Sequence, residues 1–144
     1  MDKIRIERVM GEEAKPAIDN FYKKNGRNGT ARKDDLFFVA YSENKIFGCV
    51  RFCVEEGTSM LRTMYVDSSC RKQGVGRTLL EEFARYLDKN NIRDVFCLPY
   101  IHLENFYGLI DFKVVPKKEV PQFLIDRSTT YAKNGTNTLY MKRL

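Results

Sequence analysis

Apolar and polar residues alternate with a period of two along residues 4–9 (IRIERV), a pattern typical of a β-strand with one buried face. The apolar positions that follow have helical spacing, at Ala14, Ile18, Phe21 and Tyr22. The segment KKNGRNG is rich in glycine and asparagine and should end this helix. The pattern predicts a strand, a helix and then a loop to about residue 35.

Three apolar segments come next, at residues 36–42 (LFFVAYS), 45–55 (KIFGCVRFCVE) and 59–66 (SMLRTMYV). Because the short turn-forming links ENK and EEGT join them, they are expected to form an antiparallel meander. One face of a long helix is then marked by the apolar residues Val75, Leu79, Leu80, Phe83 and Leu87. This helix is expected to end at KNN (89–91).

The C-terminal third begins with the short apolar segment DVFCLPY (94–100), which is typical of a strand inside a sheet. We predict a helix over HLENFYGLI (102–110) and two final strands, VVPKKEV (114–120) and TNTLYMKRL (136–144). The predicted fold class is α/β of the α+β type, with a mixed, mostly antiparallel central sheet flanked by helices.

The bulk composition is that of a soluble globular protein, with 43% hydrophobic and 31% charged residues. A chain of 144 residues is expected to form a single domain, residues 1–144. No apolar run approaches the ~18 residues that a membrane span needs, and MDKIRIERVM resembles neither a signal nor a transit peptide. A cytoplasmic location with no membrane partner is the expectation.

The net charge of +6 favours an anionic partner such as a phosphate or a carboxylate. Lysine and arginine are scattered and no nucleic-acid recognition motif is present, so no nucleic-acid partner is expected. The four cysteines lack C-x-x-C spacing and His102 is the only histidine, so no metal site is expected. We expect reduced thiols, with Cys49 and Cys53 acting as small core residues.

Two glycines, Gly74 and Gly76, stand in the segment RKQGVGRTLL (71–80), where the long helix starts. Glycine costs a helix about 1 kcal/mol relative to alanine, so their presence calls for a reason. Free N–H groups at a helix N-terminus bind anions, and glycine lets a bulky anion approach the backbone. With Arg71, Lys72 and Arg77 nearby, the segment predicts a phosphate or pyrophosphate site; a loop that only turns the chain is the alternative.

Two known phosphate motifs do not fit this segment. A P-loop needs G-x-x-x-x-G-K-[ST], and no such lysine follows either glycine. The dinucleotide-binding fingerprint needs a third glycine, where this chain has Leu79. The preceding strands also have the pattern of a meander and not of a βαβ unit.

The segment RKQGVG, after a strand that ends in MYVD, resembles the acetyl-CoA pyrophosphate loop of the GNAT N-acetyltransferase superfamily. The segment NFYGLIDF (105–112) is similar to the family's helix that ends in Tyr-x-x-x-(Gly)-Phe, and the predicted element order matches the family fold over nearly the whole chain. The resemblance implies acetyl-CoA as cosubstrate.

The resemblance also implies residue roles. Met64, Tyr65 and Val66 should splay from the neighbouring strand and bind the pantetheine arm, with the Val66 N–H as an oxyanion donor. Tyr107 matches the general acid for the departing thiolate; its alternative role is a core aromatic. The pyrophosphate should be held by Arg71, Lys72, Gln73, Gly74, Val75, Gly76, Arg77 and Thr78.

This chain departs from the family pattern at two positions. The family glycine before the final phenylalanine is Asp111 here, and the frequent asparagine near the start of that helix falls around Tyr100. One coenzyme contact is therefore in question. No general base is evident either: His102 is one candidate, with a structural helix-start role as its alternative, and a water chain is another. Glu55 and Glu56 are expected to be solvated in the hairpin turn.

The acceptor is indicated by a pair of arginines. If the hairpin turns at Glu56–Gly57, Arg51 lies directly opposite Arg62. Like charges in that position are destabilising, which favours a clamp for an anion such as a carboxylate. Two surface arginines that cover a sheet edge are the alternative.

The predicted function is an N-acetyltransferase in which a primary amine of a small molecule, such as an amino acid, attacks acetyl-CoA directly in a ternary complex. The segment DFKVVPKKEVPQFL is weakly similar to amino-acid acetyltransferases of the N-acetylglutamate synthase type. A protein or peptide acetyltransferase and a non-catalytic acyl-CoA sensor are the alternatives. The oligomeric state is open, with a homodimer as one alternative.

Overall fold

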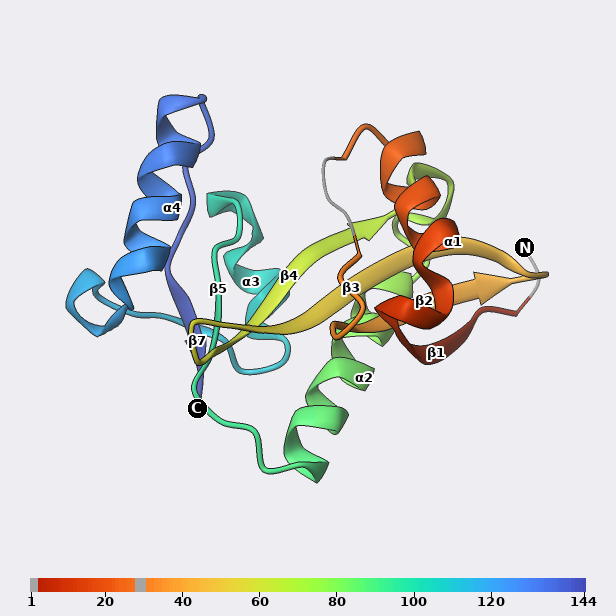
Figure 1. The fold of residues 1–144 in the computed structure, drawn as a ribbon, viewed down its shortest axis with the longest axis horizontal. Helices are drawn as coiled ribbons and strands as arrows, with labels where there is room; N and C mark the ends of the chain where they lie inside the picture. The colour runs from red at the N-terminus through yellow and green to blue at the C-terminus, as the bar shows by residue number, and fades with distance from the viewer. Residues whose placement is uncertain (1–2, 28–30) are drawn as a thin grey trace.

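The computed structural model describes residues 3–27 and 31–144, which build one seven-stranded sheet with four α-helices (Figure 1). The strand order is β1-β2-β3-β4-β5-β7-β6, and only the β4–β5 neighbours are parallel. The predicted mixed, mostly antiparallel sheet is thus confirmed. The strands are β1 (Arg5–Met10), β2 (Leu36–Ser42), β3 (Lys45–Glu55), β4 (Thr58–Val66), β5 (Val95–Cys97), β6 (Lys113–Val114) and β7 (Met141–Arg143).

The hairpin between β3 and β4 turns as the sequence predicts. Glu56 and Gly57 have φ of 47° and 75°, the left-handed pair that a two-residue hairpin loop requires. Arg51 is therefore the direct partner of Arg62. The register predicted from the turn is confirmed.

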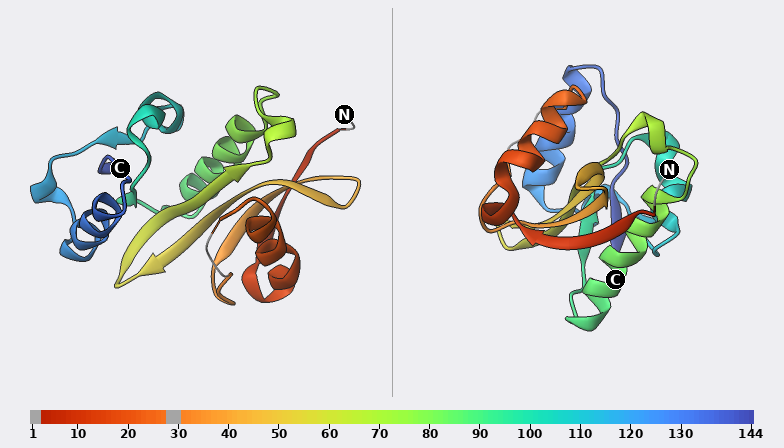
Figure 2. Two further views of the ribbon diagram at one scale, coloured as in Figure 1. Left: turned by 90° about the horizontal axis from the view of Figure 1, so that it is seen from above. Right: turned by 90° about the vertical axis from the view of Figure 1, so that its right-hand side faces the viewer.

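Alternate residues of the central strands face two different helices, α1 (Gly11–Lys24) and α2 (Val75–Lys89). Phe37, Val39 and Cys49 pack with α1, whereas the residues next to them in sequence pack with α2, among them Phe38, Ala40 and Val50. Because side chains alternate across a strand, the two helices cover opposite faces of the sheet, as Figure 2 shows.

The predicted apolar face of α2 is confirmed, since all five of its residues are at most 4% exposed. The predicted loop after α1 lies partly outside the described residues. All four cysteines are buried, and none of them forms a disulfide. In the part of the chain that the structure describes, no helix has the length and apolar character to cross a bilayer.

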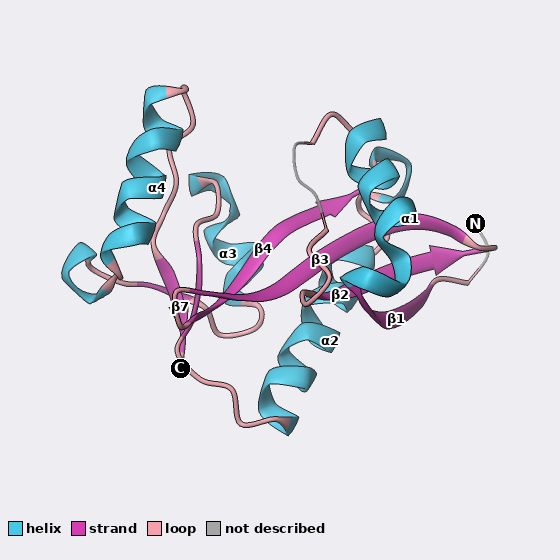
Figure 3. Cartoon of the chain, viewed as in Figure 1, coloured by secondary structure: helices cyan, strands magenta, loops and turns pink. Residues whose placement is uncertain are grey.

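The C-terminal prediction is wrong in one element. A helix, α4 (Gln122–Lys133), lies between the last two strands, and the strand predicted at 114–120 is reduced to Lys113–Val114. Leu124 is the one buried residue of α4. The apolar residues at its start, Phe123, Leu124 and Ile125, are consecutive and do not mark one helical face; Pro121, just before the helix, was the available signal. In Figure 3, α4 and α1 stand apart with β4 and β5 running between them.

Candidate active site

The predicted anion cradle follows the end of β4. A 3-10 turn (Ser68–Cys70) leads to α2, and Gly74 takes a left-handed φ of 78° as its N-cap. No described side chain caps the N-terminus of α2, and the Thr78 N–H donates to the Gly74 carbonyl at 3.0 Å, so helical bonding begins there. The first-turn amides are thus available to an anion, namely those of Val75, Gly76 and Arg77.

A cavity of about 550 Å³, called the outer cavity, lies against this cradle and reaches the short helix α3 (Glu104–Gly108). The predicted coenzyme-binding residues that line it are Met64, Tyr65, Val66, Arg71, Lys72, Gly74, Val75, Gly76 and Arg77. The two remaining predicted residues do not line the cavity, and their side chains bind nearby backbone. The side-chain amide of Gln73 donates to the Ser69 carbonyl, and the Thr78 hydroxyl donates to the Gly74 carbonyl.

Gly76 is required for close packing as well as for access. A Cβ at this position would lie 3.1 Å from Cζ of Phe106 and 3.5 Å from Cε of Met64, and both of these residues also line the outer cavity. At Gly74 a Cβ would meet nothing within 4 Å, and there the positive φ favours glycine. The two glycines therefore serve different purposes.

Strands β4 and β5 diverge, as predicted for the coenzyme-binding end of β4. They share a single partner pair, Met60 and Phe96. Beyond it, a middle cavity of about 380 Å³ lies between Thr63–Tyr65 and residues 98–100. On its other side β4 still pairs with β3: Asp67 N–H donates to the Phe47 carbonyl at 2.8 Å. Because hydrogen-bonded pairs alternate along an antiparallel ladder, the Val66 N–H points away from β3.

Tyr107 lies where the cavities meet. Its side chain lines the outer cavity, the middle cavity and a smaller inner cavity of about 120 Å³ at the base of the β4–β5 divergence. It is 6% exposed, and burial, with lesser contributions from Cys97 and Tyr100, raises the pKa of its hydroxyl well above the ordinary value. No described residue hydrogen-bonds to this hydroxyl, which is therefore a neutral donor free to serve a ligand.

His102, the candidate base, lies on the short 3-10 turn before α3. Its ring is exposed and stacks on Tyr100, with centroids 5.9 Å apart. It lines the outer cavity and neither of the two smaller ones. His102 and the cradle thus line the same cavity.

The two predicted clamp arginines go to different partners. Arg51 is 5% exposed, donates to Asp35 at 3.0 Å, and lines none of the three cavities. Arg62 lines the inner cavity and donates to Glu55 at 2.6 Å. A clamp that uses both guanidinium groups does not fit this arrangement, because Arg51 is buried against Asp35 and lines none of the three cavities.

Glu55 is not solvated as expected; its side chain is 9% exposed. Arg32, Arg62 and Arg127 all pair with it. Burial opposes ionisation, but hydrogen bonds from Arg127 and Arg62 outweigh it and lower the pKa of Glu55 to about 2. Arg127 comes from α4, so the sequence interpretation that missed this helix also missed the residue.

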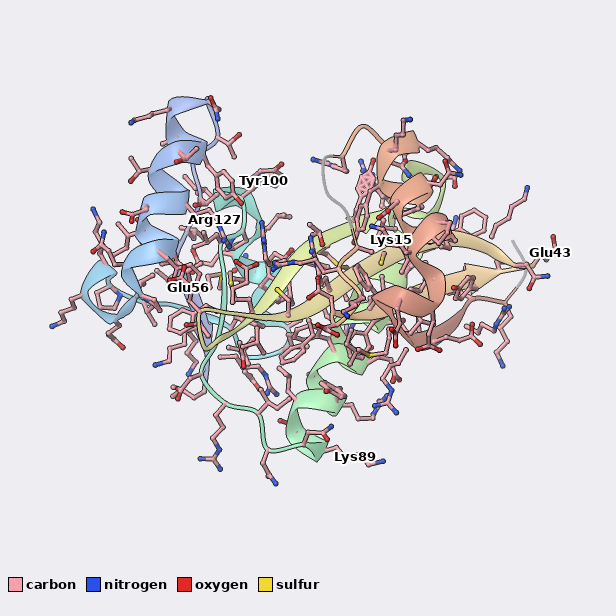
Figure 4. All side chains as sticks on the ribbon, viewed as in Figure 1. Lys15, Glu43, Glu56, Lys89, Tyr100 and Arg127 are labelled. Atoms are coloured by element: carbon pink, nitrogen blue, oxygen red, sulfur yellow. The ribbon has the colours of Figure 1, made fainter. Side chains whose placement is uncertain are left out.

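Arg127 adds a second guanidinium to the inner cavity, which Arg62 also lines. Figure 4 shows it on the side of α4 that faces the sheet. Among the described residues, four guanidinium groups of this ion-pair cluster share two carboxylates, those of Asp35 and Glu55. The cluster carries excess positive charge next to the inner cavity. Within residues 3–27 and 31–144, no group of three or more potential metal ligands occurs.

Comparison with protein families and with solved structures points to acetyltransferases in both cases. A family model described as the acetyltransferase (GNAT) domain matches residues 33–114. The structure is similar to N-acetylglutamate synthase from Neisseria gonorrhoeae, complexed with coenzyme A and N-acetyl-glutamate, with a TM-score of 0.71 and 16% identity over 99% of this chain. This chain spans 35% of that protein. No curated protein sequence matches significantly.

Two other solved structures match this chain over nearly their own full length. An acyl-CoA N-acyltransferase from Pseudomonas aeruginosa has a TM-score of 0.70 and 14% identity over 99% of this chain and 100% of that one. The ribosomal-protein-S18-alanine N-acetyltransferase from Escherichia coli has a TM-score of 0.63 and 15% identity over 96% of this chain and 92% of that one. At these identities the similarity establishes the fold, and proteins with different acceptors share it.

Proposed function

The chain belongs to the GNAT family of acetyltransferases, and we propose that it acetylates the primary amine of a small molecule that carries a carboxylate. Acetyl-CoA is the donor that the family uses. The acceptor is proposed from one observation: two guanidinium groups, those of Arg62 and Arg127, line the inner cavity that Tyr107 also lines.

The proposed orientation of the donor follows the lining of the outer cavity. Its pyrophosphate binds the amides at the start of α2, and its pantetheine arm follows the end of β4 toward Tyr107. The neutral amine attacks the thioester carbon, and a backbone N–H of β4, such as that of Val66, stabilises the oxyanion. As the carbon–sulfur bond breaks, the Tyr107 hydroxyl protonates the thiolate, and coenzyme A leaves as the thiol.

The amine must lose a proton in this reaction. No described carboxylate or imidazole lines the middle or inner cavity, so water is the proton acceptor that we propose. His102, which lines the outer cavity, is the alternative base. The thiol pKa values of two cysteines also support direct attack by the amine, without an acetylated cysteine. Burial raises the pKa of Cys49 to about 12 and that of Cys53 to about 11, which makes both poor nucleophiles.

The inner cavity suits a carboxylate by charge and by size. Arg62 and Arg127 share Glu55, and each keeps further N–H groups beyond that pair. The Tyr131 hydroxyl, 3.5 Å from Arg62, adds another polar group to the same wall. The middle and inner cavities share five lining residues: Thr63, Leu98, Pro99, Tyr107 and Tyr131. A carboxylate in the inner cavity would thus leave the amine near the thioester.

The test is an acetylation assay on matched acceptors: amino acids, their decarboxylated amines, and short peptides. We expect the Arg127→Gln variant to raise KM for carboxylate-bearing amines by about tenfold or more, the value of one charged hydrogen bond, and to leave decarboxylated amines unchanged. Arg85→Gln, which alters an exposed arginine paired with Glu82 on α2, is the control. Preference for peptides, or equal effects on both kinds of amine, would overturn the proposed acceptor.

A further inference from the structure

Strand β4 contains one more residue than its partner β3 between Arg62 and Tyr65. Arg51 pairs with Arg62, but the next partner pair along this ladder is Cys49 with Tyr65. One residue of β3 therefore faces two residues of β4, Thr63 and Met64, which defines a β-bulge. Thr63 has a φ of 49°, a left-handed conformation that is unfavourable for a β-branched residue.

Two buried side chains from other elements hold this bulge. The Tyr22 hydroxyl, from α1, donates to the Thr63 carbonyl at 2.7 Å and lies 3.3 Å from the Thr63 hydroxyl. Arg51, from β3, donates its Nε–H to the Thr63 hydroxyl at 3.2 Å while Asp35 holds its Nη1. Tyr22 is 2% exposed, and burial is the main cause that raises its pKa, so its hydroxyl keeps its proton.

The bulge lies between the donor and acceptor parts of the site. Thr63 lines the inner and middle cavities, whereas Met64 and Tyr65 line the middle and outer ones. The conformation of Thr63 therefore fixes where the end of β4 lies relative to Arg62. In enzymes, a misplacement of about 1 Å between reacting groups can cost about 100-fold in rate.

We propose that Tyr22 and Arg51 are positioning residues, which hold the strained bulge at Thr63 so that the backbone of β4 meets the thioester in register with the acceptor cavity. This gives Arg51 a role that needs no contact with a ligand. The inference depends on the acetyl transfer stated above, and it holds for any acceptor class.

The test removes one hydroxyl. Tyr22→Phe keeps the ring and deletes the donor to Thr63, and Thr63→Val keeps the β-branched shape and deletes the acceptor of the Arg51 bond. Tyr140→Phe is the matched control, since its hydroxyl makes a hydrogen bond of the same 2.7 Å length, to Ser128, and lines none of the three cavities. Amide NMR spectra and kinetics are recorded for each variant.

We expect the amide signals of residues 63–66 to shift in both site variants and to stay in place in the control. With the best amine of the acceptor panel, kcat should fall about tenfold or more while KM for acetyl-CoA changes less than about twofold. Wild-type spectra at 63–66 in Tyr22→Phe, or a kcat no lower than that of Tyr140→Phe, would overturn the proposal. The spectra need no acceptor, so this result is separate from a failure of the carboxylate proposal.

Discussion

Arg51 and Arg62 face each other across the β3–β4 pair, yet each guanidinium group is bound to a different carboxylate. Arg51 reaches Asp35 and Arg62 reaches Glu55, so the repulsion expected of opposed like charges is relieved within the protein. The cost is that the two carboxylates are themselves largely buried, with side chains 8% and 9% exposed. The ion pairs are therefore sensitive to loss of either partner.

Asp35→Asn should strongly destabilise the protein, because it leaves Arg51 buried with its charge unpaired. Removal of one partner from a buried ion pair typically costs about 3–5 kcal/mol. Urea denaturation should show a lower midpoint with an unchanged slope. Asp94→Asn, whose partner is Lys142 and whose side chain is 65% exposed, is the control and should cost about 1 kcal/mol or less. Equal losses in the two variants would contradict the prediction.

Glu55 should make stability depend on acid pH. Its pKa of about 2 in the folded protein lies below the ordinary 4.5, so its contribution is present above pH 4.5 and is lost as the pH falls toward 2. The difference between these two pKa values corresponds to about 3 kcal/mol in the free energy of unfolding. Of this contribution, about 2 kcal/mol should be lost between pH 6 and pH 3.

The measurement is the free energy of unfolding of wild type and of Glu55→Gln at those two pH values. The stability gap between them should narrow as the pH falls. Glu81→Gln, in an exposed pair with Arg77, provides the reference for ordinary carboxyl effects. A gap at Glu55 that does not change with pH would show that the arginines do not hold its charge.

The sequence predicted those parts of the site that depend on local pattern. The hairpin register came from Glu56–Gly57 because a two-residue turn fixes strand pairing, and the cradle came from glycines at a helix start. The ion-pair partner of Arg51 and the second arginine of the inner cavity were not predictable in this way. Asp35 meets Arg51, and Arg127 meets Glu55, only through tertiary packing of segments far apart in sequence, and Arg127 belongs to a helix with one buried residue. The strained Thr63 likewise has no sequence signal.

The two glycines of the cradle should respond differently to alanine. Gly74→Ala places a side chain at a φ of 78° and should cost about 1 kcal/mol of stability through backbone strain, with little effect on coenzyme affinity. Gly76→Ala gains helix propensity of about 1 kcal/mol, but its methyl group presses on Phe106 at the outer cavity. Its coenzyme A affinity should fall about tenfold or more by calorimetric titration. The opposite ranking of the two affinities would refute the separate roles.

Tyr107→Phe decides whether the site is a catalyst or only binds acyl-CoA. The hydroxyl is the one group of Tyr107 that this change removes, and general acid catalysis typically contributes about 10²–10⁴-fold. We expect kcat to fall by that order with coenzyme A affinity within about twofold, and Tyr86→Phe, which lines none of the three cavities, to keep wild-type kinetics. Because burial raises the pKa of Tyr107, wild-type activity should not decline through its ionisation up to about pH 10. An unchanged kcat would assign Tyr107 to the core and leave protonation of the thiolate to water.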